Sequence, residues 1–323
     1  MTILTAPYTH ARKQFADDVV RGLTHCGQKE LPSKYLYDAL GSTLFDAITL
    51  LPEYGLTRAE ERLLQRHAGD IAKYVPRHTT VSELGSGTGR KTRSILNALR
   101  ERSPLSYYPI EISSAALASC VTELRDIESV SVVGVESEYL SGLAEVAACR
   151  KPDAHLLVLF LGSTIGNFDA GADAVFLREI RKTLRAGDSL LLGTDLIKSR
   201  ERLIEAYYDS RGVTAAFNLN LLGRINRELH GDFHLRAFEH TVRFNEVTQS
   251  VEMHLRSRRQ QSVSIADCDL LVDFAAGETI WTESSHKYSL AEVSVLASKS
   301  RFALQAQWTD DKWGFATSLL VAI

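Results

Sequence analysis

Three glycines that alternate with other residues, Gly85, Gly87 and Gly89, directly follow a strand-like segment at residues 80–84. Glycine tolerates the backbone conformations of a tight turn and lets a ligand approach the main chain closely. The helix predicted over residues 91–102 would direct its free N–H groups at such a ligand. Because ordinary strand-to-helix turns also show this glycine spacing, it indicates a ligand site only together with a second feature.

A carboxylate at the end of the next strand supplies that second feature. The predicted strand at residues 107–111 ends in Glu111, about one βα unit after the glycine turn. An acidic side chain at this position of a nucleotide-binding sheet binds the hydroxyl groups of a ribose. The turn and Glu111 together predict a cofactor that contains a nucleoside, either a dinucleotide or S-adenosylmethionine.

Up to about residue 199, strand-like and helical patterns alternate and indicate the scaffold that positions these groups. Strands are predicted over residues 80–84, 107–111, 130–135, 155–162 and 189–193, and helices over residues 91–102, 114–127 and 172–184. The alternation predicts an α/β fold with a parallel, doubly wound sheet. Ligands of such sheets bind beyond the carboxyl ends of the strands, where Glu83, Glu111 and the segment after Leu161 lie.

Two parts of the chain depart from this alternation. The first sixty residues are helical and irregular, and Thr57 and Glu60 have the spacing of a helix-capping box. After Asp195 the pattern changes to helical segments and alternating strand-like stretches. We therefore predict a substrate-binding module of residues 1–60 plus 196–286, and a cofactor-binding core of residues 61–195 plus 287–323.

The C-terminal segments 302–309 and 315–323 predict an antiparallel hairpin that completes the sheet. A seven-stranded sheet with a reversed terminal hairpin is the usual form of class I methyltransferases, and dehydrogenases normally lack that ending. The hairpin therefore favours S-adenosylmethionine over a dinucleotide.

Composition narrows the class of protein further. The 323 residues are 45% hydrophobic, and 37 basic against 40 acidic residues leave a formal charge of -3 without a dense basic run. We expect a globular enzyme and no nucleic-acid partner. Residues 1–11 contain no apolar core of signal-peptide length and no stretch elsewhere approaches the length of a membrane span, so we expect a cytoplasmic protein without membrane contact.

The four cysteines, Cys26, Cys120, Cys149 and Cys268, lack the spacing of a metal site. The histidines likewise show no H-E-x-x-H motif. We therefore predict reduced thiols and no bound metal.

Several long strings of residues elsewhere in the chain are more specific than the glycine turn. They are Leu31-Pro32-Ser33-Lys34-Tyr35-Leu36-Tyr37-Asp38, Leu51-Pro52-Glu53-Tyr54, Phe160-Leu161-Gly162-Ser163-Thr164-Ile165-Gly166-Asn167, Leu190-Leu191-Leu192-Gly193-Thr194-Asp195 and Thr282-Glu283-Ser284-Ser285. In these strings the sequence resembles the histidine-specific Nα-methyltransferases of ergothioneine biosynthesis, from Leu31 to the C-terminus. Members of that family trimethylate L-histidine to hercynine.

The resemblance implies a role for each matching position. Residues implied to surround S-adenosylmethionine are Gly85, Gly87, Lys91, Glu111 and Tyr54, with Glu136 on the adenine side. Residues implied to hold the carboxylate and amine of the amino acid are Asn167, Tyr207, Tyr54 and the backbone near Gly162. Residues implied to bind the imidazole are Glu283 and Ser285, in a pocket lined by Tyr37, Phe45, Thr214 and Met253.

Two positions depart from the family pattern. The family usually has Asp where Glu111 stands, and its Gly-Asp-Phe near the adenine is replaced by Val135-Glu136-Ser137. Each change keeps an acid but alters the contacts expected with the cofactor.

The implied chemistry is an in-line methyl transfer from a sulfonium to an amine, for which the protein mainly supplies alignment. The sulfonium charge favours the neutral amine, so we expect no dedicated strong base. Tyr54 and Tyr207 would orient the amine, and a tyrosine-rich site suits the cation that forms as methyl groups accumulate. Glu283 would accept an imidazole N–H and Ser285 would serve the other nitrogen.

Other interpretations of the same residues stay open at the level of sequence. Tyr37, Phe45 and Tyr54 also fit an aromatic core, Asn167 fits a helix cap and Lys91 fits a solvated side chain. The alternative functions are methylation of another aromatic amino acid, which Glu283 and Met253 disfavour, a dinucleotide-dependent oxidoreductase, and a catalytically silent homologue that binds the cofactor. We expect a monomer with a small-molecule substrate.

Overall fold

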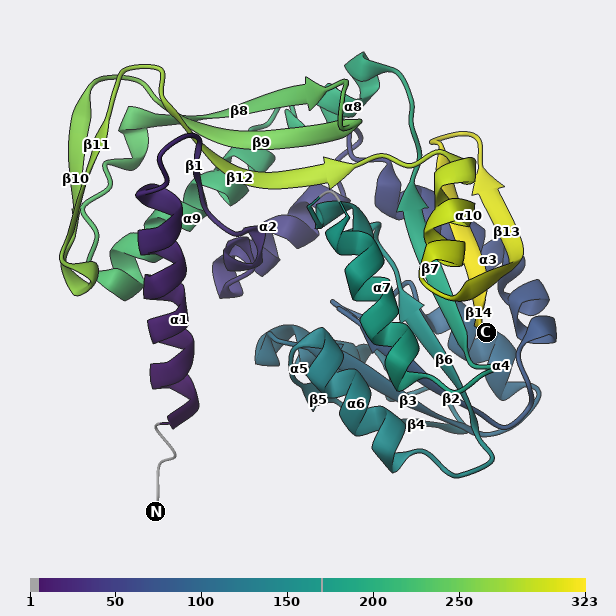
Figure 1. Cartoon of the computed structure of the whole chain (residues 1–323). Helices are drawn as coiled ribbons and strands as arrows, with labels where there is room; N and C mark the ends of the chain where they lie inside the picture. The colour runs from purple at the N-terminus through teal and green to yellow at the C-terminus, as the bar shows by residue number, and fades with distance from the viewer. Residues whose placement is uncertain (1–5, 170) are drawn as a thin grey trace. The chain divides into compact units, whose positions relative to one another are not determined.

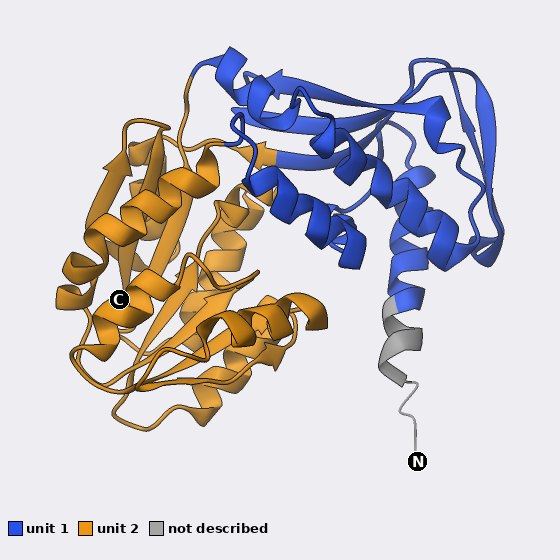
Figure 2. Ribbon diagram, turned by 180° about the vertical axis from the view of Figure 1, so that it is seen from behind, with its two compact units in different colours: residues 1–54, 199–284 blue, residues 55–198, 285–323 orange. Residues whose placement is uncertain are grey.

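A computed structural model describes residues 6–169 and 171–323 and divides the chain into two compact units (Figure 2). Unit 1 consists of Met1–Tyr54 and Ser199–Ser284, and unit 2 of Gly55–Lys198 and Ser285–Ile323. These borders lie within six residues of those predicted at residues 60, 195 and 286. The assignment of substrate to one unit and cofactor to the other stays a prediction.

Unit 2 is built on one large, mostly parallel sheet (Figure 1). Its strands, in spatial order, are β13 (Phe302–Asp310), β14 (Phe315–Ala322), β7 (Ser189–Asp195), β6 (His155–Phe160), β2 (Thr79–Leu84), β3 (Leu105–Glu111) and β4 (Val130–Val132). The short strand β5 (Val135–Glu136) also pairs with β3. Only the β13–β14 and β14–β7 pairs are antiparallel. The predicted reversed hairpin at the end of the chain is therefore confirmed.

Helices cover both faces of this sheet. One face carries α3 (Leu56–Tyr74), α4 (Arg93–Arg100) and α5 (Ser114–Leu124), and the other carries α6 (Tyr139–Cys149), α7 (Ala172–Thr183) and α10 (Leu290–Lys299). Each layer buries an apolar stripe against the strands, with Leu64 and Leu96 in the first core and Leu177 and Val293 in the second. The sequence prediction of a doubly wound α/β fold is confirmed.

The sheet order places the first strand, β2, in the middle, with β3 on one side and β6 on the other. The chain therefore changes direction across the sheet at the carboxyl end of β2. Crevices that bind ligands form at such switch points in open α/β sheets. The glycine turn at residues 85–89 lies directly at that end.

In the part of the chain that the structure describes, unit 1 contains a four-stranded sheet, a two-stranded sheet and four α-helices. The four-stranded sheet has the order β1 (Lys29–Glu30), β12 (Thr279–His286), β9 (Ser250–Ser257) and β8 (Phe238–Asn245), and β10 (Gln261–Ile265) pairs with β11 (Leu270–Phe274). Its helices are α1 (Ala6–Leu23), α2 (Ala39–Thr49), α8 (Arg200–Tyr207) and α9 (Val213–Leu229). The last two residues of β12 belong to unit 2.

The segment around Asp38 is fixed by local contacts. Asp38 caps α2 by accepting from the Gly41 amide at 2.7 Å and also accepts from Asn220 of α9 at 2.7 Å. A Cβ on Gly41 would lie 1.7 Å from the Leu36 carbonyl oxygen, so only glycine fits there. These contacts hold the Tyr37 segment against α9.

The structure corrects two local predictions. Thr57 and Glu60 do not form a capping box, because the residue that caps α3 is Gly55 and it makes no side-chain cap. The predicted strand at residues 130–135 is divided into β4 and β5. Helices α6 and α10 were not predicted from the sequence, and α4 begins at Arg93 rather than at Lys91.

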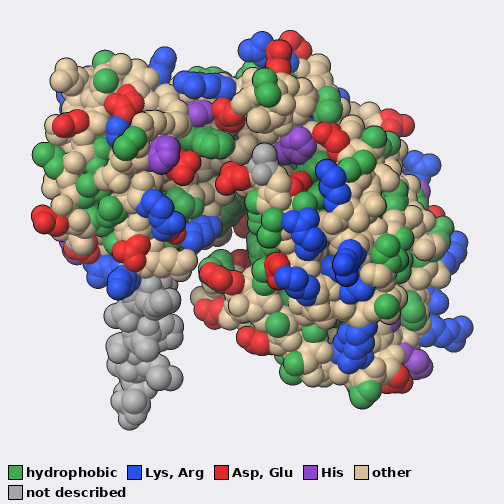
Figure 3. Space-filling model, in the orientation of Figure 1, with side chains coloured by type: hydrophobic (Ala, Val, Ile, Leu, Met, Phe, Trp, Pro, Cys, Tyr) green, Lys and Arg blue, Asp and Glu red, His purple; other side chains and the backbone are tan. Residues whose placement is uncertain are grey.

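The surface charges and the cysteines do not indicate a particular function. Acidic and basic side chains both occur on the face drawn in Figure 3. All four cysteines are free. Within the part of the chain that the structure describes, no helix is long and apolar enough to cross a membrane.

Candidate functional site

The glycine turn after β2 has the backbone conformation that its sequence predicts. Gly85, Gly87 and Gly89 have φ angles of +72°, +52° and +72°, which L side chains rarely adopt. A Cβ on Gly89 would lie 2.6 Å from Cys120 Sγ, whereas a Cβ on Gly87 would meet no atom within 4 Å. Gly89 is therefore required by packing, and Gly87 borders open space suited to a ligand.

Glu111 lies at the carboxyl end of β3, beside this turn. Its carboxylate accepts from the backbone amides of Ile112 at 2.9 Å and Ser113 at 3.2 Å, and from the Gly87 amide at 3.4 Å. In the register of β3 with β5, Glu136 pairs directly with Glu111. Two acids thus stand side by side at the carboxyl edge of the sheet, and backbone amides orient the first of them.

Tyr139, at the start of α6, is a residue of this region that the sequence did not single out. Its hydroxyl lies close to Gly85, since a Cβ built there would be 3.0 Å away. Burial and the nearby Glu111 carboxylate raise the pKa of Tyr139 to about 12, so it is a neutral hydrogen-bonding group. No helix was predicted over residues 139–149, so the sequence did not indicate this position.

Lys91 is bound by a buried carboxylate rather than solvated. Its Nζ forms an ion pair with Glu60 of α3, whose side chain is 0% exposed. Burial alone would lower the pKa of Lys91, but the Glu60 carboxylate raises it. The interpretation of Lys91 as a freely solvated side chain is wrong.

Glu60 also holds the loop after β6. The Gly162 amide donates to both carboxylate oxygens of Glu60, at 2.7 and 3.0 Å. A Cβ on Gly193 of β7 would lie 2.3 Å from Glu60 Oε1, so glycine at this position makes room for the carboxylate. Glu60 therefore connects two predicted ligand-binding positions, Lys91 and Gly162, although its sequence spacing indicated a helix cap.

Glu83 is the second-last residue of β2, and its side chain is buried. It accepts hydrogen bonds from Thr92 Oγ1 at 2.6 Å and from the Tyr107 hydroxyl. Burial raises the pKa of Glu83 to about 7, against the opposite effect of these two donors. Glu83 thus shapes the underside of the glycine turn and is not itself presented to solvent.

The loop after β6 contains the predicted residue Asn167. Gly162 and Ser163 have φ angles of +74° and +57°, and the Asp195 amide donates to Ser163 Oγ at 2.8 Å. Asn167 ends a short 3₁₀ helix, Thr164–Asn167, and is half-buried. Because α7 begins only at Ala172 and is capped by Gly171, the interpretation of Asn167 as a helix cap is wrong.

A buried lysine lies beside Ser285, the predicted imidazole ligand of unit 2. Lys287 is 0% exposed, donates to Ser285 Oγ at 2.8 Å and pairs with Asp195 Oδ2 at 3.1 Å. The other oxygen of Asp195 accepts from Lys198 at 2.6 Å and from Trp313 Nε1 at 3.0 Å. Ser285 is therefore attached to a buried charge network.

Unit 1 collects most of the predicted aromatic residues into one cluster. Tyr37 and Phe45 lie 5.4 Å apart between ring centroids, Phe45 and Tyr54 lie 6.3 Å apart, and Tyr54 and Tyr207 lie 6.1 Å apart. Phe217 of α9 joins them, at 5.4 Å from Tyr37. Phe217 was not predicted, because its helical spacing does not distinguish it from an ordinary core residue.

The other predicted pocket residues of unit 1 are buried. Thr214 is in the first turn of α9, Met253 is in β9 and Glu283 is in β12, with 3%, 2% and 8% of their surfaces exposed. Thr282 Oγ1 donates to the Met253 carbonyl at 3.0 Å and thereby ties β12 to β9. Glu283 is thus a buried carboxylate within a sheet.

A buried imidazole fixes the backbone of Tyr207. His240 Nε2 lies 2.9 Å from the Tyr207 carbonyl, and its Nδ1 lies 3.0 Å from Asn218 Nδ2. Because the amide nitrogen only donates, Nδ1 accepts and Nε2 carries the proton. Burial lowers the pKa of His240, in keeping with a neutral ring.

The predicted site residues are distributed over the two units. Those in unit 1 are Tyr37, Phe45, Tyr54, Tyr207, Thr214, Met253 and Glu283. Those in unit 2 are Gly85, Gly87, Lys91, Glu111, Glu136, Gly162, Asn167 and Ser285.

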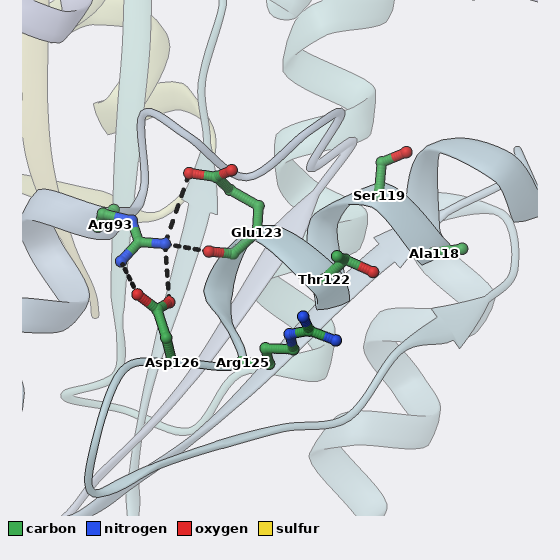
Figure 4. A pocket seen from close by; sticks show the side chains of 7 residues that line it. All are labelled: Arg93, Ala118, Ser119, Thr122, Glu123, Arg125 and Asp126. Atoms are coloured by element: carbon green, nitrogen blue, oxygen red, sulfur yellow. Dashed lines mark hydrogen bonds and ion pairs between the residues drawn. The ribbon is translucent and has the colours of Figure 1, made fainter.

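A separate hollow of about 630 Å³ lies between α4 and α5 (Figure 4) and contains none of these residues. Arg93, on its wall, is bound by Glu123 and Asp126, and the other lining side chains are exposed. The hollow therefore lacks the buried, oriented polar groups found around Lys91 and Ser285. Among residues 6–169 and 171–323, no group of three His, Cys, Asp or Glu side chains is placed to hold a metal ion.

The switch-point glycine turn, the acid after β3 and the reversed hairpin define a class I, S-adenosylmethionine-dependent methyltransferase. Comparison with known proteins identifies the family. A family model described as "Histidine-specific methyltransferase, SAM-dependent" matches residues 15–322. The chain belongs to this family, and the dinucleotide-dependent oxidoreductase is ruled out.

Individual relatives agree with this membership. A histidine N-alpha-methyltransferase of Mycolicibacterium smegmatis is 43% identical over 329 residues, 99% of this chain and 100% of that protein. One of Mycobacterium tuberculosis is 42% identical over 304 residues, 94% and 93% of the two chains. Ergothioneine biosynthesis protein 1 of Neurospora crassa is 33% identical over 201 residues, 62% of this chain and 23% of that protein.

Proposed function

We propose that this enzyme methylates the α-amino nitrogen of L-histidine, in three steps that end at hercynine, within ergothioneine biosynthesis. The family and the names of the relatives support this reaction. The observation that carries the proposal is the ring cluster of unit 1, which brings Tyr54 and Tyr207 to 6.1 Å from each other. These rings offer both phenolic hydroxyls and aromatic faces to an amine.

S-adenosylmethionine fits the residues at the carboxyl edge of the large sheet. The open space above Gly87 would admit the ligand, and Glu111, already oriented by backbone amides, has the chemistry to accept from ribose hydroxyls. Lys91 would offer a fixed positive charge to the carboxylate of the cofactor, and Glu136 would lie on the adenine side. When bound, the cofactor supplies a methyl group activated by its sulfonium charge.

The amine requires orientation more than deprotonation by a strong base. His240, the buried histidine nearest to Tyr207, already uses both ring nitrogens and cannot accept a proton from the substrate. Tyr54 and Tyr207 would orient the lone pair through their hydroxyls. As methyl groups replace N–H donors, the ring faces would stabilise the growing cation by about 0.5–2 kcal/mol for each contact.

The carboxylate and amine of histidine would also be held by the loop after β6. Asn167 can donate and accept at once, which suits a zwitterion. The Gly162 N–H is already donated to Glu60, so a substrate contact at Gly162 would use its carbonyl oxygen. An accepting carbonyl is appropriate for the ammonium or amine end of the substrate.

Specificity for histidine would reside in a buried carboxylate and a hydroxyl two residues apart on β12. Glu283 would accept an imidazole N–H and Ser285 would serve the other nitrogen, in a pocket lined by Tyr37, Phe45, Thr214 and Met253. An indole or a phenol would leave one of these polar groups unsatisfied, at a cost of about 1–3 kcal/mol. That cost corresponds to a discrimination of about 10- to 100-fold.

The test is mass spectrometry of the products formed from histidine and S-adenosylmethionine by the purified enzyme. We expect mass increases that correspond to one, two and three methyl groups, with the trimethylated product at the end of the reaction. Parallel reactions with tryptophan and tyrosine test the alternative substrates. Turnover of tryptophan or tyrosine in preference to histidine would contradict the proposal.

We further propose that the enzyme acts as a monomer in the cytoplasm on the free amino acid. Light scattering coupled to size-exclusion chromatography measures the mass of the particle in solution. A particle of twice the mass of the chain would contradict the monomer.

A further inference from the structure

Lys287 is a charged residue in the interior of unit 2 that no predicted role requires. It follows β12 directly and is 0% exposed. Removing a lysine ammonium from water is costly unless partners compensate, and here the partners are Asp195 at 3.1 Å and Ser285 Oγ at 2.8 Å. Asp195 compensates the charge, so the additional hydrogen bond from Lys287 to Ser285 needs a reason other than packing.

The chemistry of this contact sets the direction of a hydrogen bond. A lysine ammonium has three donors and no acceptor, so Ser285 Oγ must accept from it. The hydroxyl proton of Ser285 is thereby turned away from Lys287 and has to be donated elsewhere. A positive donor on the oxygen also polarises the O–H bond and makes it a stronger donor.

Asp195 keeps Lys287 in this place. One of its oxygens faces Lys287, while the other accepts from Lys198 at 2.6 Å and from Trp313 Nε1 at 3.0 Å. The backbone amide of Asp195 donates to Ser163 at 2.8 Å, which ties the carboxylate to the loop after β6. Lys287 is therefore held by a buried carboxylate whose other oxygen accepts two further hydrogen bonds.

We propose that Lys287 is a specificity-determining positioning residue, which forces Ser285 to act as a hydrogen-bond donor toward the unprotonated nitrogen of a neutral imidazole. The inference rests on the proposed function, in which Glu283 and Ser285 bind the histidine side chain. Glu283, a carboxylate, takes the N–H of the ring, and Ser285 supplies the proton for the lone pair. The pair thus recognises one donor and one acceptor on a ring, a combination that indole and benzene rings lack.

A double-mutant cycle on Ser285→Ala and Lys287→Met tests this role. Each single change is expected to lower kcat/KM for histidine by about 10- to 100-fold, mainly through KM. In the Ser285→Ala background, Lys287→Met is expected to cost less than twofold more, because it acts only through the hydroxyl. Calorimetric affinity for S-adenosylhomocysteine is expected to stay within twofold in all three variants.

Lys198→Met is the matched control, because Lys198 pairs with the other oxygen of the same carboxylate, Asp195 Oδ1, whereas Lys287 pairs with Oδ2 and donates to Ser285. We expect its kcat/KM for histidine to stay within threefold of wild type. Effects of Lys287→Met and Ser285→Ala that multiply, or an equal loss in Lys198→Met, would overturn the proposal. Loss of S-adenosylhomocysteine binding in step with kcat/KM would also overturn it, since it indicates a general structural role.

If Lys287→Met does not fold, Lys287→Arg and Lys287→Gln replace it. Arginine has only donors, so Lys287→Arg is expected to keep the preference for histidine over phenylalanine. Glutamine can also accept, so Lys287→Gln is expected to lower the preference for histidine over phenylalanine at least tenfold. A stronger preference for histidine in Lys287→Gln than in Lys287→Arg would overturn the proposal. The proposed function fails separately, if the wild-type enzyme does not methylate histidine.

Discussion

The predicted site residues of the two units differ in the buried groups that surround them. In unit 1 the predicted site residues form a cluster of rings, and the nearby buried imidazole of His240 is neutral and satisfied on both nitrogens. In unit 2 the predicted site residues are attached to buried ion pairs, Glu60 with Lys91 and Asp195 with Lys287. In the proposed function, the rings and the Asp195–Lys287 pair would serve the amino acid, and the Glu60–Lys91 pair would serve the cofactor.

An amine that becomes a permanent cation loses its N–H donors, so its site must bind it without hydrogen bonds. Aromatic faces meet that need, because their attraction for a cation does not depend on a hydrogen bond. A cofactor with a carboxylate and ribose hydroxyls instead needs charges and amides in fixed positions. Buried ion pairs fix such groups, since breaking one leaves an uncompensated charge.

Glu60→Ala gives the sharpest test of the charged half of this comparison. The substitution leaves Lys91 without its carboxylate and the Gly162 amide without its acceptor, so we expect a loss of about 3–5 kcal/mol in the free energy of unfolding. Urea unfolding measures this change, and affinity for S-adenosylhomocysteine should fall with it. Glu61→Ala is the control, because Glu61 forms its ion pair with the mostly exposed Arg90, and the substitution should cost less than about 1 kcal/mol. Equal losses of unfolding free energy in the two variants would show that Glu60 contributes no more than an exposed ion pair.

Tyr54→Phe tests the aromatic half. The ring stays in its cluster while the hydroxyl is lost, so we expect kcat/KM for histidine to fall about 10- to 100-fold with little change in thermal stability. Tyr35→Phe is the counterpart, since the Tyr35 hydroxyl donates to Asp18 at 2.6 Å in the core of unit 1. That variant should lose about 1–2 kcal/mol of stability and keep its kcat/KM. The same effect in both variants would show that Tyr54 acts only in packing.

The glycine turn allows packing and ligand binding to be separated within unit 2. Gly89→Ala would place a Cβ 2.6 Å from Cys120 Sγ, so we expect it to lower stability by about 1–3 kcal/mol. Gly87→Ala meets no protein atom, so beyond about 1 kcal/mol of backbone strain its effect should appear in affinity for S-adenosylhomocysteine. Calorimetric titration alongside thermal unfolding distinguishes the two; a ligand defect confined to Gly89→Ala would reverse the assignment.

The smallest expected effect concerns the pH dependence of stability, which has opposite signs in the two units. Burial lowers the pKa of His240 below its usual 6.5, so its contribution to stability is present above pH 6.5 and is lost as pH falls through the folded pKa. Burial raises the pKa of Glu83 from 4.5 to about 7, so its contribution is present below pH 4.5 and is lost as pH rises through about 7.

Urea unfolding of wild type and Glu83→Gln between pH 5 and 8 measures the second contribution. Glutamine does not titrate, so the variant should gain stability relative to wild type as pH rises across this range. A difference between the two proteins that stays constant with pH would show that Glu83 has an ordinary pKa.

Much of unit 2 could be predicted from sequence because its information is local. The apolar run of β6 and the helical spacing of α7 each lie within a dozen residues, and the glycine turn needs only its own φ angles. Thr57 and Glu60 show the limit of such reasoning. Their spacing is that of a capping box, yet Glu60 is turned inward by Lys91 and Gly162, which are distant in sequence.

The sequence by itself determined the strand–helix alternation up to about residue 199, the reversed hairpin and, through long matching strings, the family. Only the tertiary structure decided which groups hold those ligand-binding residues in place: Glu60 beneath Lys91, Phe217 within the ring cluster and Lys287 behind Ser285. The physical reason is that hydrophobic periodicity and turn chemistry act between neighbours along the chain. A buried charge, in contrast, is explained only by the partners that folding brings to it.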